Sequence, residues 1–151
     1  MSELIKAGVA APDFSLADQN EQVVSLADFK GKKVLLSWHP LAWTSVCMDQ
    51  MRSLERNYDR FTDKNTVVLG LSVDPQPSKS AWAKVLCLDN LLILSDFNPL
   101  GAVSKAYGNY IDQASISGRA NVLIDENGVV LWSKQYDIPE LPDVEEVLAQ
   151  L

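Results

Sequence analysis

One segment of the chain places a nucleophilic side chain where a helix is predicted to begin. It reads His39-Pro40-Leu41-Ala42-Trp43-Thr44-Ser45-Val46-Cys47. Unpaired backbone N–H groups and the positive end of the helix dipole favour a thiolate over a thiol in a first helical turn. Pro40 removes a backbone donor and stiffens the loop, and the Thr44 hydroxyl can turn toward the same pocket. The position alone also suits a structural cysteine at the head of an apolar stripe, so both interpretations stay open.

The elements that must position this segment alternate between strands and helices. Apolar runs predict strands at 34–38, 66–73 and 91–94, and helical spacing predicts helices at 45 to about 61, 78 to about 86, 100–107 and around 144–151. Two hairpins are predicted, one pairing 13–16 with 22–25 and one pairing 120–124 with 129–133. This order predicts an α/β fold with a mixed central β-sheet, helices on both faces and an N-terminal β-hairpin.

Composition bounds the classes of function. A chain of 151 residues with 47% hydrophobic residues suits a single domain spanning 1–151. Its 13 basic and 20 acidic side chains give a net charge of −7, the wrong sign for binding nucleic acid or an anionic membrane. We therefore expect neither as a partner.

Several features predict a cytoplasmic protein without a metal site. No apolar run approaches the roughly 18 residues that cross a bilayer, and the first residues lack the pattern of a secretory signal. Cys47 and Cys87 are too few for a disulfide scaffold, and a single histidine, His39, excludes a multi-histidine metal site. The glycines form no phosphate-binding loop, so no nucleotide is expected.

The spacing Pro40-x-x-x-Thr44-x-x-Cys47 matches the P-x-x-x-T-x-x-C signature of the peroxiredoxins. The chain resembles that family, the alkyl hydroperoxide reductase/thiol-specific antioxidant superfamily, over almost its whole length. Further matching segments are Ala11–Phe14, Leu94–Asp96 and Arg119–Asp125. Its short length resembles the compact members, whereas His-Pro before the loop is similar to longer one-cysteine members.

The resemblance implies a thioredoxin-like fold and a thiol-dependent peroxidase acting on hydrogen peroxide and organic hydroperoxides. Cys47 would be the peroxidatic cysteine that becomes a sulfenic acid, and Pro40, Thr44 and Arg119 would complete its pocket. Without the resemblance, Arg119 would be interpreted as part of a surface ion pair. The resemblance also implies no metal or organic cofactor, a thioredoxin-like protein or low-molecular-weight thiol as reductant, and a homodimer.

Two residues near Cys47 depart from the common family pattern. Met48 stands where proline is frequent, and Gln50 stands where many members carry glutamate. These departures concern the subgroup rather than groups expected to contact peroxide. The segment also lacks the second cysteine of a C-x-x-C motif, which disfavours a dithiol disulfide exchanger.

Alternatives remain for the second cysteine and for the function. Cys87 is either a resolving thiol that attacks the Cys47 sulfenic acid or a buried structural cysteine, in which case an outside thiol reduces Cys47. A redox sensor or adaptor on the same fold would use Cys47 oxidation to change its binding to another protein. A cysteine hydrolase would instead need His39 as its base, whereas His39 is more readily interpreted as a loop or core residue near the pocket.

Overall fold

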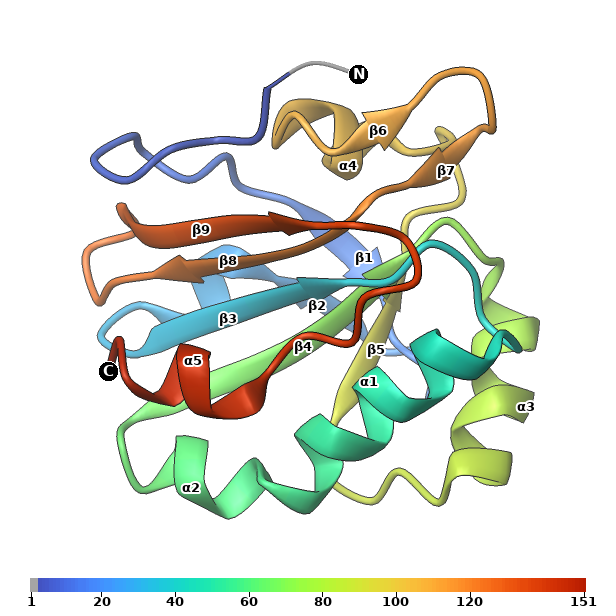
Figure 1. Cartoon of the computed structure of the whole chain (residues 1–151), viewed down its shortest axis with the longest axis horizontal. Helices are drawn as coiled ribbons and strands as arrows, with labels where there is room; N and C mark the ends of the chain where they lie inside the picture. Colours follow the sequence, from blue (N-terminus) through green and yellow to red (C-terminus); the bar gives the residue numbers. More distant parts are fainter. Residues whose placement is uncertain (1–2) are drawn as a thin grey trace.

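A mixed β-sheet organises the chain in the computed structural model, which describes residues 3–151 (Figure 1). The strands are β1 (Ser15–Ala17), β2 (Val23–Ser25), β3 (Lys33–Trp38), β4 (Thr66–Ser72), β5 (Leu92–Ser95), β6 (Tyr110–Ile111), β7 (Ile116–Ser117), β8 (Arg119–Ile124) and β9 (Val130–Tyr136). The helices are α1 (Ser45–Arg56), α2 (Tyr58–Thr62), α3 (Gln76–Leu86), α4 (Ala102–Ala106) and α5 (Val144–Leu148), with a short 3-10 helix η1 (Leu26–Phe29).

Seven strands form the main sheet in the order β2-β1-β5-β4-β3-β8-β9, and β6 pairs with β7 separately. β3, β4 and β5 are parallel, whereas β8, β9 and the N-terminal hairpin β1–β2 pair in antiparallel fashion. β3 and β4 are almost continuously apolar because both faces of these central strands are covered. The carboxyl ends of the three parallel strands therefore meet at one edge, where the loop that precedes α1 begins.

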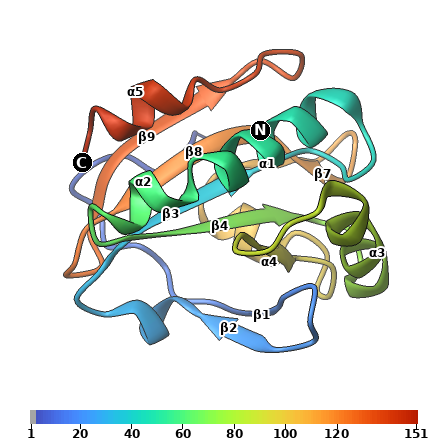
Figure 2. The ribbon, with the colours of Figure 1, turned by 90° about the horizontal axis from the view of Figure 1, so that it is seen from below.

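Helices cover both faces of this sheet, as predicted (Figures 1 and 2). α1, α2, α3 and α5 bury one apolar layer, which includes Met51, Phe61 and Trp82. The other layer lies beneath α4, η1 and the N-terminal segment, and includes Trp38 and Tyr107 with ring centroids 5.2 Å apart. The predicted N-terminal hairpin is also confirmed. Among residues 3–151, no helix has the length and apolar character needed to cross a membrane.

The helix predicted from 45 to about 61 is wrong in its continuity, because it breaks at Asn57. The Asn57 side chain donates to the Ser53 carbonyl at 2.8 Å and accepts from Arg60 at 3.0 Å, so it competes with the backbone ladder. The apolar stripe survives the break, since Tyr58 and Phe61 still pack against the same core.

Two other details differ from the sequence prediction. The second long helix begins at Gln76 rather than at a Ser78 cap, because Pro77 suits a first helical turn and the Ser78 hydroxyl accepts from the Trp43 indole. The short pairing of β6 with β7 was not predicted. Their two-residue length gives too little alternation for a strand pattern to be visible.

Candidate active site

Cys47 occupies the third position of α1, directly after the loop that leaves β3. Thr44 is the N-cap residue in an extended conformation, and its carbonyl accepts from the Met48 N–H at 2.9 Å. Cys47 is unpaired and fully buried beneath the loop. The prediction that this thiol lies in a first helical turn is therefore confirmed.

Arg119 reaches Cys47 from a strand 72 residues further along the chain. β8 pairs with β3 so that Trp38 lies opposite Ala120, which places Arg119 at the end of β3 where the active-site loop starts. The guanidinium Nη1 lies 3.4 Å from Cys47 Sγ. The antiparallel register thus brings two predicted site residues that lie far apart in sequence, Cys47 and Arg119, into direct contact.

The charge of Arg119 is buried without an acidic partner. The residue is 2% exposed, and no carboxylate among residues 3–151 lies within ion-pair distance of it. The interpretation of Arg119 as a surface ion pair is therefore wrong. A buried cation without a counter-charge attracts any anion that its surroundings can form. The Cys47 thiolate is the group in direct contact that can supply it.

Gln50 orients the guanidinium that faces Cys47. Its Oε1 accepts from Arg119 Nη1 at 2.6 Å, while its Nε2 donates to Ser37 Oγ at 2.8 Å and to the Trp38 carbonyl at 3.1 Å. These donor contacts fix which end of the amide faces Arg119. Because an amide is neutral, it holds the guanidinium without cancelling its charge. Gln50 lies three residues after Cys47 on α1, a spacing that signals a shared helix face.

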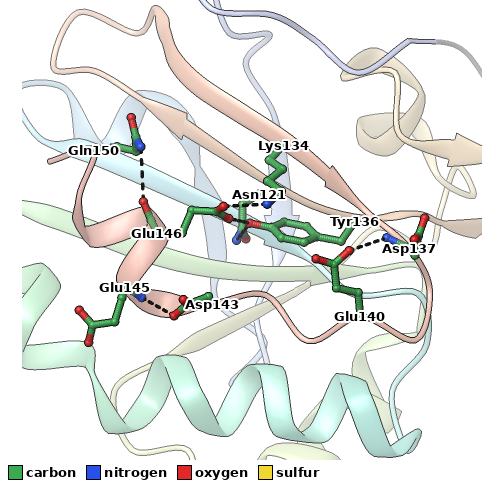
Figure 3. Close-up of polar contacts among 9 residues, drawn as sticks. All are labelled: Asn121, Lys134, Tyr136, Asp137, Glu140, Asp143, Glu145, Glu146 and Gln150. Atoms are coloured by element: carbon green, nitrogen blue, oxygen red, sulfur yellow. Dashed lines mark hydrogen bonds and ion pairs between the residues drawn. The ribbon is translucent and has the colours of Figure 1, made fainter.

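The Ile138 carbonyl fixes the other side of the guanidinium. It accepts from Arg119 Nε at 2.9 Å and from Nη2 at 2.7 Å. Ile138 lies in the segment between β9 and α5, and polar contacts across that segment hold its two ends together (Figure 3). The Glu146 carboxylate accepts from Tyr136 Oη and from Lys134 Nζ, each at 2.7 Å. No sequence signal marked the contact between Arg119 and Ile138, because the acceptor is a backbone carbonyl.

The active-site loop is anchored to the segment that leads into α3. The Ala42 N–H donates to the Asp74 carboxylate at 2.9 Å, and the Trp43 indole donates to Ser78 Oγ at 2.9 Å. These contacts hold Trp43 in a left-handed backbone conformation with φ of 73°, which is unfavourable for a bulky residue. The loop geometry therefore depends on contacts with α3.

The remaining predicted pocket residues lie in this loop. Pro40, the second residue after β3, is buried, and Thr44 is exposed. The Thr44 hydroxyl donates to the Leu41 carbonyl at 2.8 Å, which leaves its oxygen lone pairs as acceptors. The Thr44 oxygen is therefore available as a hydrogen-bond acceptor three residues before Cys47.

His39 is a buried residue, as the core interpretation predicted. Its Nε2 lies 2.8 Å from Lys79 Nζ, and Arg119 is the hydrogen-bond partner of Cys47 Sγ among the described residues. Burial, followed by the positive charges of Lys79 and Arg119, holds the pKa of His39 well below its usual value of 6.5. No Cys-His pair of the kind a cysteine hydrolase needs is formed between these side chains.

Cys87 lies away from this site. It is exposed and caps the C-terminal end of α3 in a left-handed conformation, so the interpretation as a buried structural cysteine is wrong. Ser78, near the other end of α3, contacts the active-site loop. The nine intervening residue steps correspond to about 14 Å along the helix axis. A disulfide needs Cα atoms within about 7 Å, so we expect that one or both helices must unwind locally before Cys87 can meet Cys47.

Comparisons with known proteins show the family of the chain. Residues 7–133 match the AhpC/TSA family. Alkyl hydroperoxide reductase E of Mycobacterium tuberculosis is 36% identical over 141 residues, covering 93% of this chain and 92% of the relative. The mitochondrial thioredoxin-dependent peroxide reductase of Drosophila melanogaster is 35% identical over 150 residues, covering 91% and 62%. The reduced 2-Cys peroxiredoxin of Plasmodium vivax superposes with a TM-score of 0.85 at 33% identity, covering 95% and 79%.

Replacing Gln50 by glutamate tests whether the uncompensated charge of Arg119 acts on Cys47. The new carboxylate would neutralise part of the guanidinium charge, so less of it would favour the thiolate. We expect Gln50→Glu to slow alkylation of Cys47 by iodoacetamide at pH 7 by about three- to tenfold. The rate follows the fraction of thiolate, and that fraction changes up to tenfold when the ionisation midpoint moves by one pH unit. Mass spectrometry in a Cys87→Ser background measures the rate at a single thiol.

The matched control is Gln113→Glu, which adds the same charge at an exposed position. Its alkylation rate should equal that of the parent. An unchanged rate in Gln50→Glu, with the folded circular dichroism spectrum retained, would contradict the assignment.

Proposed function

The chain belongs to the AhpC/TSA family and is a thiol-dependent peroxidase with a thioredoxin-like fold, and from that premise we propose that Cys47 is its peroxidatic cysteine. The proposed substrates are hydrogen peroxide and organic hydroperoxides, and residues 1–151 act as one domain. The observation that carries the residue assignment is the 3.4 Å contact between Arg119 Nη1 and Cys47 Sγ. This reaction requires no metal or organic cofactor.

The proposed reaction is an in-line attack of the Cys47 thiolate on one peroxide oxygen. A sulfur–oxygen bond forms and the oxygen–oxygen bond breaks, which gives a sulfenic acid and an alkoxide or hydroxide. The leaving oxygen then takes a proton to become an alcohol or water. Two external thiols reduce the sulfenic acid to the thiol, forming a disulfide and water.

Pro40, Thr44 and Arg119 have separate roles in this proposal. Pro40 shapes the loop, and the Thr44 hydroxyl oxygen accepts from the peroxide O–H. Arg119 favours the thiolate and donates to the oxygen on which negative charge develops. Its fixed orientation between Gln50 and Ile138 avoids reorganisation during the reaction.

Magnitudes indicate that ionisation is the smaller of the two contributions of the pocket. An ordinary thiol with a pKa near 8.5 is about 3% ionised at pH 7, so complete ionisation gains at most roughly 30-fold, or about 2 kcal/mol. One donor positioned for the transition state is typically worth about 10²–10³ in rate. We therefore assign the larger share of catalysis to the placement of Arg119.

Reduction by an external thiol is the proposed recycling step. One similar protein is named as thioredoxin-dependent, so a thioredoxin-like protein or a low-molecular-weight thiol is the proposed reductant. The need for a reducing thiol pool also favours the cytoplasm as the location. Cys87 as a resolving thiol remains a prediction, and we expect it to require local unwinding of one or both helices.

A redox sensor on the same fold is the second candidate function. Cys47 is fully buried, so a reducing protein can reach its sulfenic acid only after the loop opens. If that opening were slow, the oxidised form would persist and could alter binding to another protein. The rate of recycling distinguishes the sensor from the peroxidase.

A homodimer is proposed on the exposed apolar side chains at the carboxyl edge of the parallel strands. Leu41 and Trp43 follow β3, while Phe97 and Leu100 follow β5, and each is between 38% and 49% exposed. Because β3 and β5 are parallel members of one sheet, these loops lie along the same edge. Clustered exposed apolar residues are typical of protein interfaces. A second copy at this edge would also cover part of the active-site loop.

Arg119→Ala is expected to slow peroxide reduction by about 10²–10³-fold even where the thiol is fully ionised, because a transition-state donor is lost. Stopped-flow rates measured at a pH above the ionisation midpoints of both proteins isolate this effect. Arg60→Ala removes the same charge at an exposed ion pair and should react like the parent. Equal rates for Arg119→Ala and the parent at that pH would refute the role.

Peroxide consumption by Cys47→Ser and Cys87→Ser, with thioredoxin or a small thiol as reductant, tests the catalytic cycle. We expect Cys47→Ser to be inactive and Cys87→Ser to sustain turnover, because an external thiol recycles Cys47. The intact mass of the parent chain, measured after one equivalent of peroxide without a reductant, should show one added oxygen. A loss of two hydrogens would instead establish resolution by Cys87, and oxidation that stalls with every reductant would establish the sensor.

Phe97→Glu is expected to shift the chain from dimer toward monomer, because it buries a charge in the proposed interface. Sedimentation equilibrium measures the change. Val85→Glu places the same charge at an exposed position of α3 and should leave the dimer intact. A monomeric parent, or a Phe97→Glu variant that dimerises as well as the parent, would contradict the proposed interface.

A further inference from the structure

Two buried ionisable groups beside the site have no role in the proposed reaction. Lys79 on α3 is completely buried, and its Nζ lies 2.8 Å from Nε2 of His39, which is also completely buried. His39 immediately follows β3 and precedes Pro40 at the start of the active-site loop. The pair therefore links the interior face of α3 to the base of the loop.

Lys79 has no acidic side chain at contact distance. Among residues 3–151, no carboxylate lies within ion-pair distance of its Nζ. The Asp74 carboxylate accepts from the Ala42 N–H and the Ser72 hydroxyl instead. The Trp82 ring lies 5.8 Å from Nζ, near the limit for an attraction between a cation and an aromatic face.

The charged groups around the pair work in opposite directions. Burial lowers the pKa of Lys79 from 10.5 to about 7, and the negative charges of Asp74 and Cys47 oppose this change. On the His39 side, the positive charges of Lys79 and Arg119 add to burial in lowering the pKa of the imidazole. His39 is thus a neutral acceptor for the Lys79 ammonium, and Lys79 changes its charge near neutral pH.

Building on the peroxidase proposed above, we propose that Lys79 is a positioning residue whose positive charge, held by His39 at the base of the active-site loop, favours the Cys47 thiolate. Such an attraction is reciprocal, because the free energy that couples two ionisations is shared by both groups. The thiolate must therefore favour the Lys79 ammonium to the same extent. In this proposal two cations act on Cys47, Arg119 by direct contact and Lys79 through its charge at the base of the loop.

The reciprocity gives this inference a signature that a purely structural lysine lacks. Below about pH 7 Lys79 carries its charge and supports the thiolate, and above that pH the charge and its effect disappear. Removing the thiolate should in turn lower the pKa of Lys79. Arg119 keeps its charge throughout this range, so the pH dependence separates the contributions of the two cations.

The first test compares Lys79→Met with Lys84→Met in a Cys87→Ser background. Methionine keeps an unbranched apolar side chain at the buried position, and Lys84 is an exposed residue of the same helix. We expect Lys79→Met to slow iodoacetamide alkylation of Cys47 by about three- to tenfold at pH 6, with the difference vanishing above pH 9. Lys84→Met should match the parent at every pH. A Lys79→Met deficit of constant size at all pH values, or no deficit, would overturn the proposal.

The second test needs no substitution at Lys79. His39 is the only histidine, so the ring ¹⁵N signals of the labelled protein belong to one residue that hydrogen-bonds with Lys79. We expect these signals to shift with a midpoint near pH 7 in the reduced parent and at a lower pH in Cys47→Ser. Identical midpoints would overturn the coupling. Neither test requires peroxidase activity, so failure of the coupling and failure of the proposed function are distinguishable.

Discussion

A buried guanidinium without an acidic partner is the constraint on which the site depends. Arg119 satisfies its N–H groups with an amide oxygen, a backbone carbonyl and the sulfur of Cys47, and of these three acceptors only the sulfur can carry a negative charge. The positive charge therefore remains available to the sulfur. It is costly to bury, and the folded chain tolerates it because these donor directions are satisfied.

Three parts of the fold hold that charge in place. The register between β3 and β8 sets the position of Arg119, α1 supplies Cys47 and Gln50, and the segment after β9 supplies the Ile138 carbonyl. The loop itself is held by Asp74, which lies between β4 and α3, and by Ser78 on α3. The site is thus built from segments that meet only in the folded chain. A net charge of −7 for the whole chain coexists with this positive site, which shows that net charge describes the surface rather than the pocket.

The sequence predicted the residues whose role depends on their neighbours along the chain. The Pro40-Thr44-Cys47 spacing and the strand-to-helix transition are local, and Arg119 was found through a resemblance rather than through any physical signal. The exposure of Cys87 was not predictable, because the flanking residues Leu86 and Leu88 suit a buried helix end as well as an exposed one. Sequence reasoning also left the helix break at Asn57 unseen, since the apolar stripe continues across it.

Contacts between distant backbone and side-chain atoms were beyond sequence reasoning. The Ile138 carbonyl carries no residue-specific signal. A lysine in a helix is normally expected at the surface, so the burial of Lys79 beside His39 is visible only in the folded chain. Gln50 was visible as a departure from a family pattern, but its hydrogen bond with Arg119 could not be predicted without the register of β3 and β8.

The central claim, that the sulfur beside Arg119 is the first atom oxidised, is tested most directly by trapping the initial product. The reduced chain is mixed with one equivalent of hydrogen peroxide in the presence of dimedone, and the adduct is located by peptide mass spectrometry at successive times. The account predicts that the earliest adduct is on Cys47 and grows in step with peroxide loss. Peroxide loss with Cys47 unmodified, or an adduct that forms first on Cys87, would contradict it.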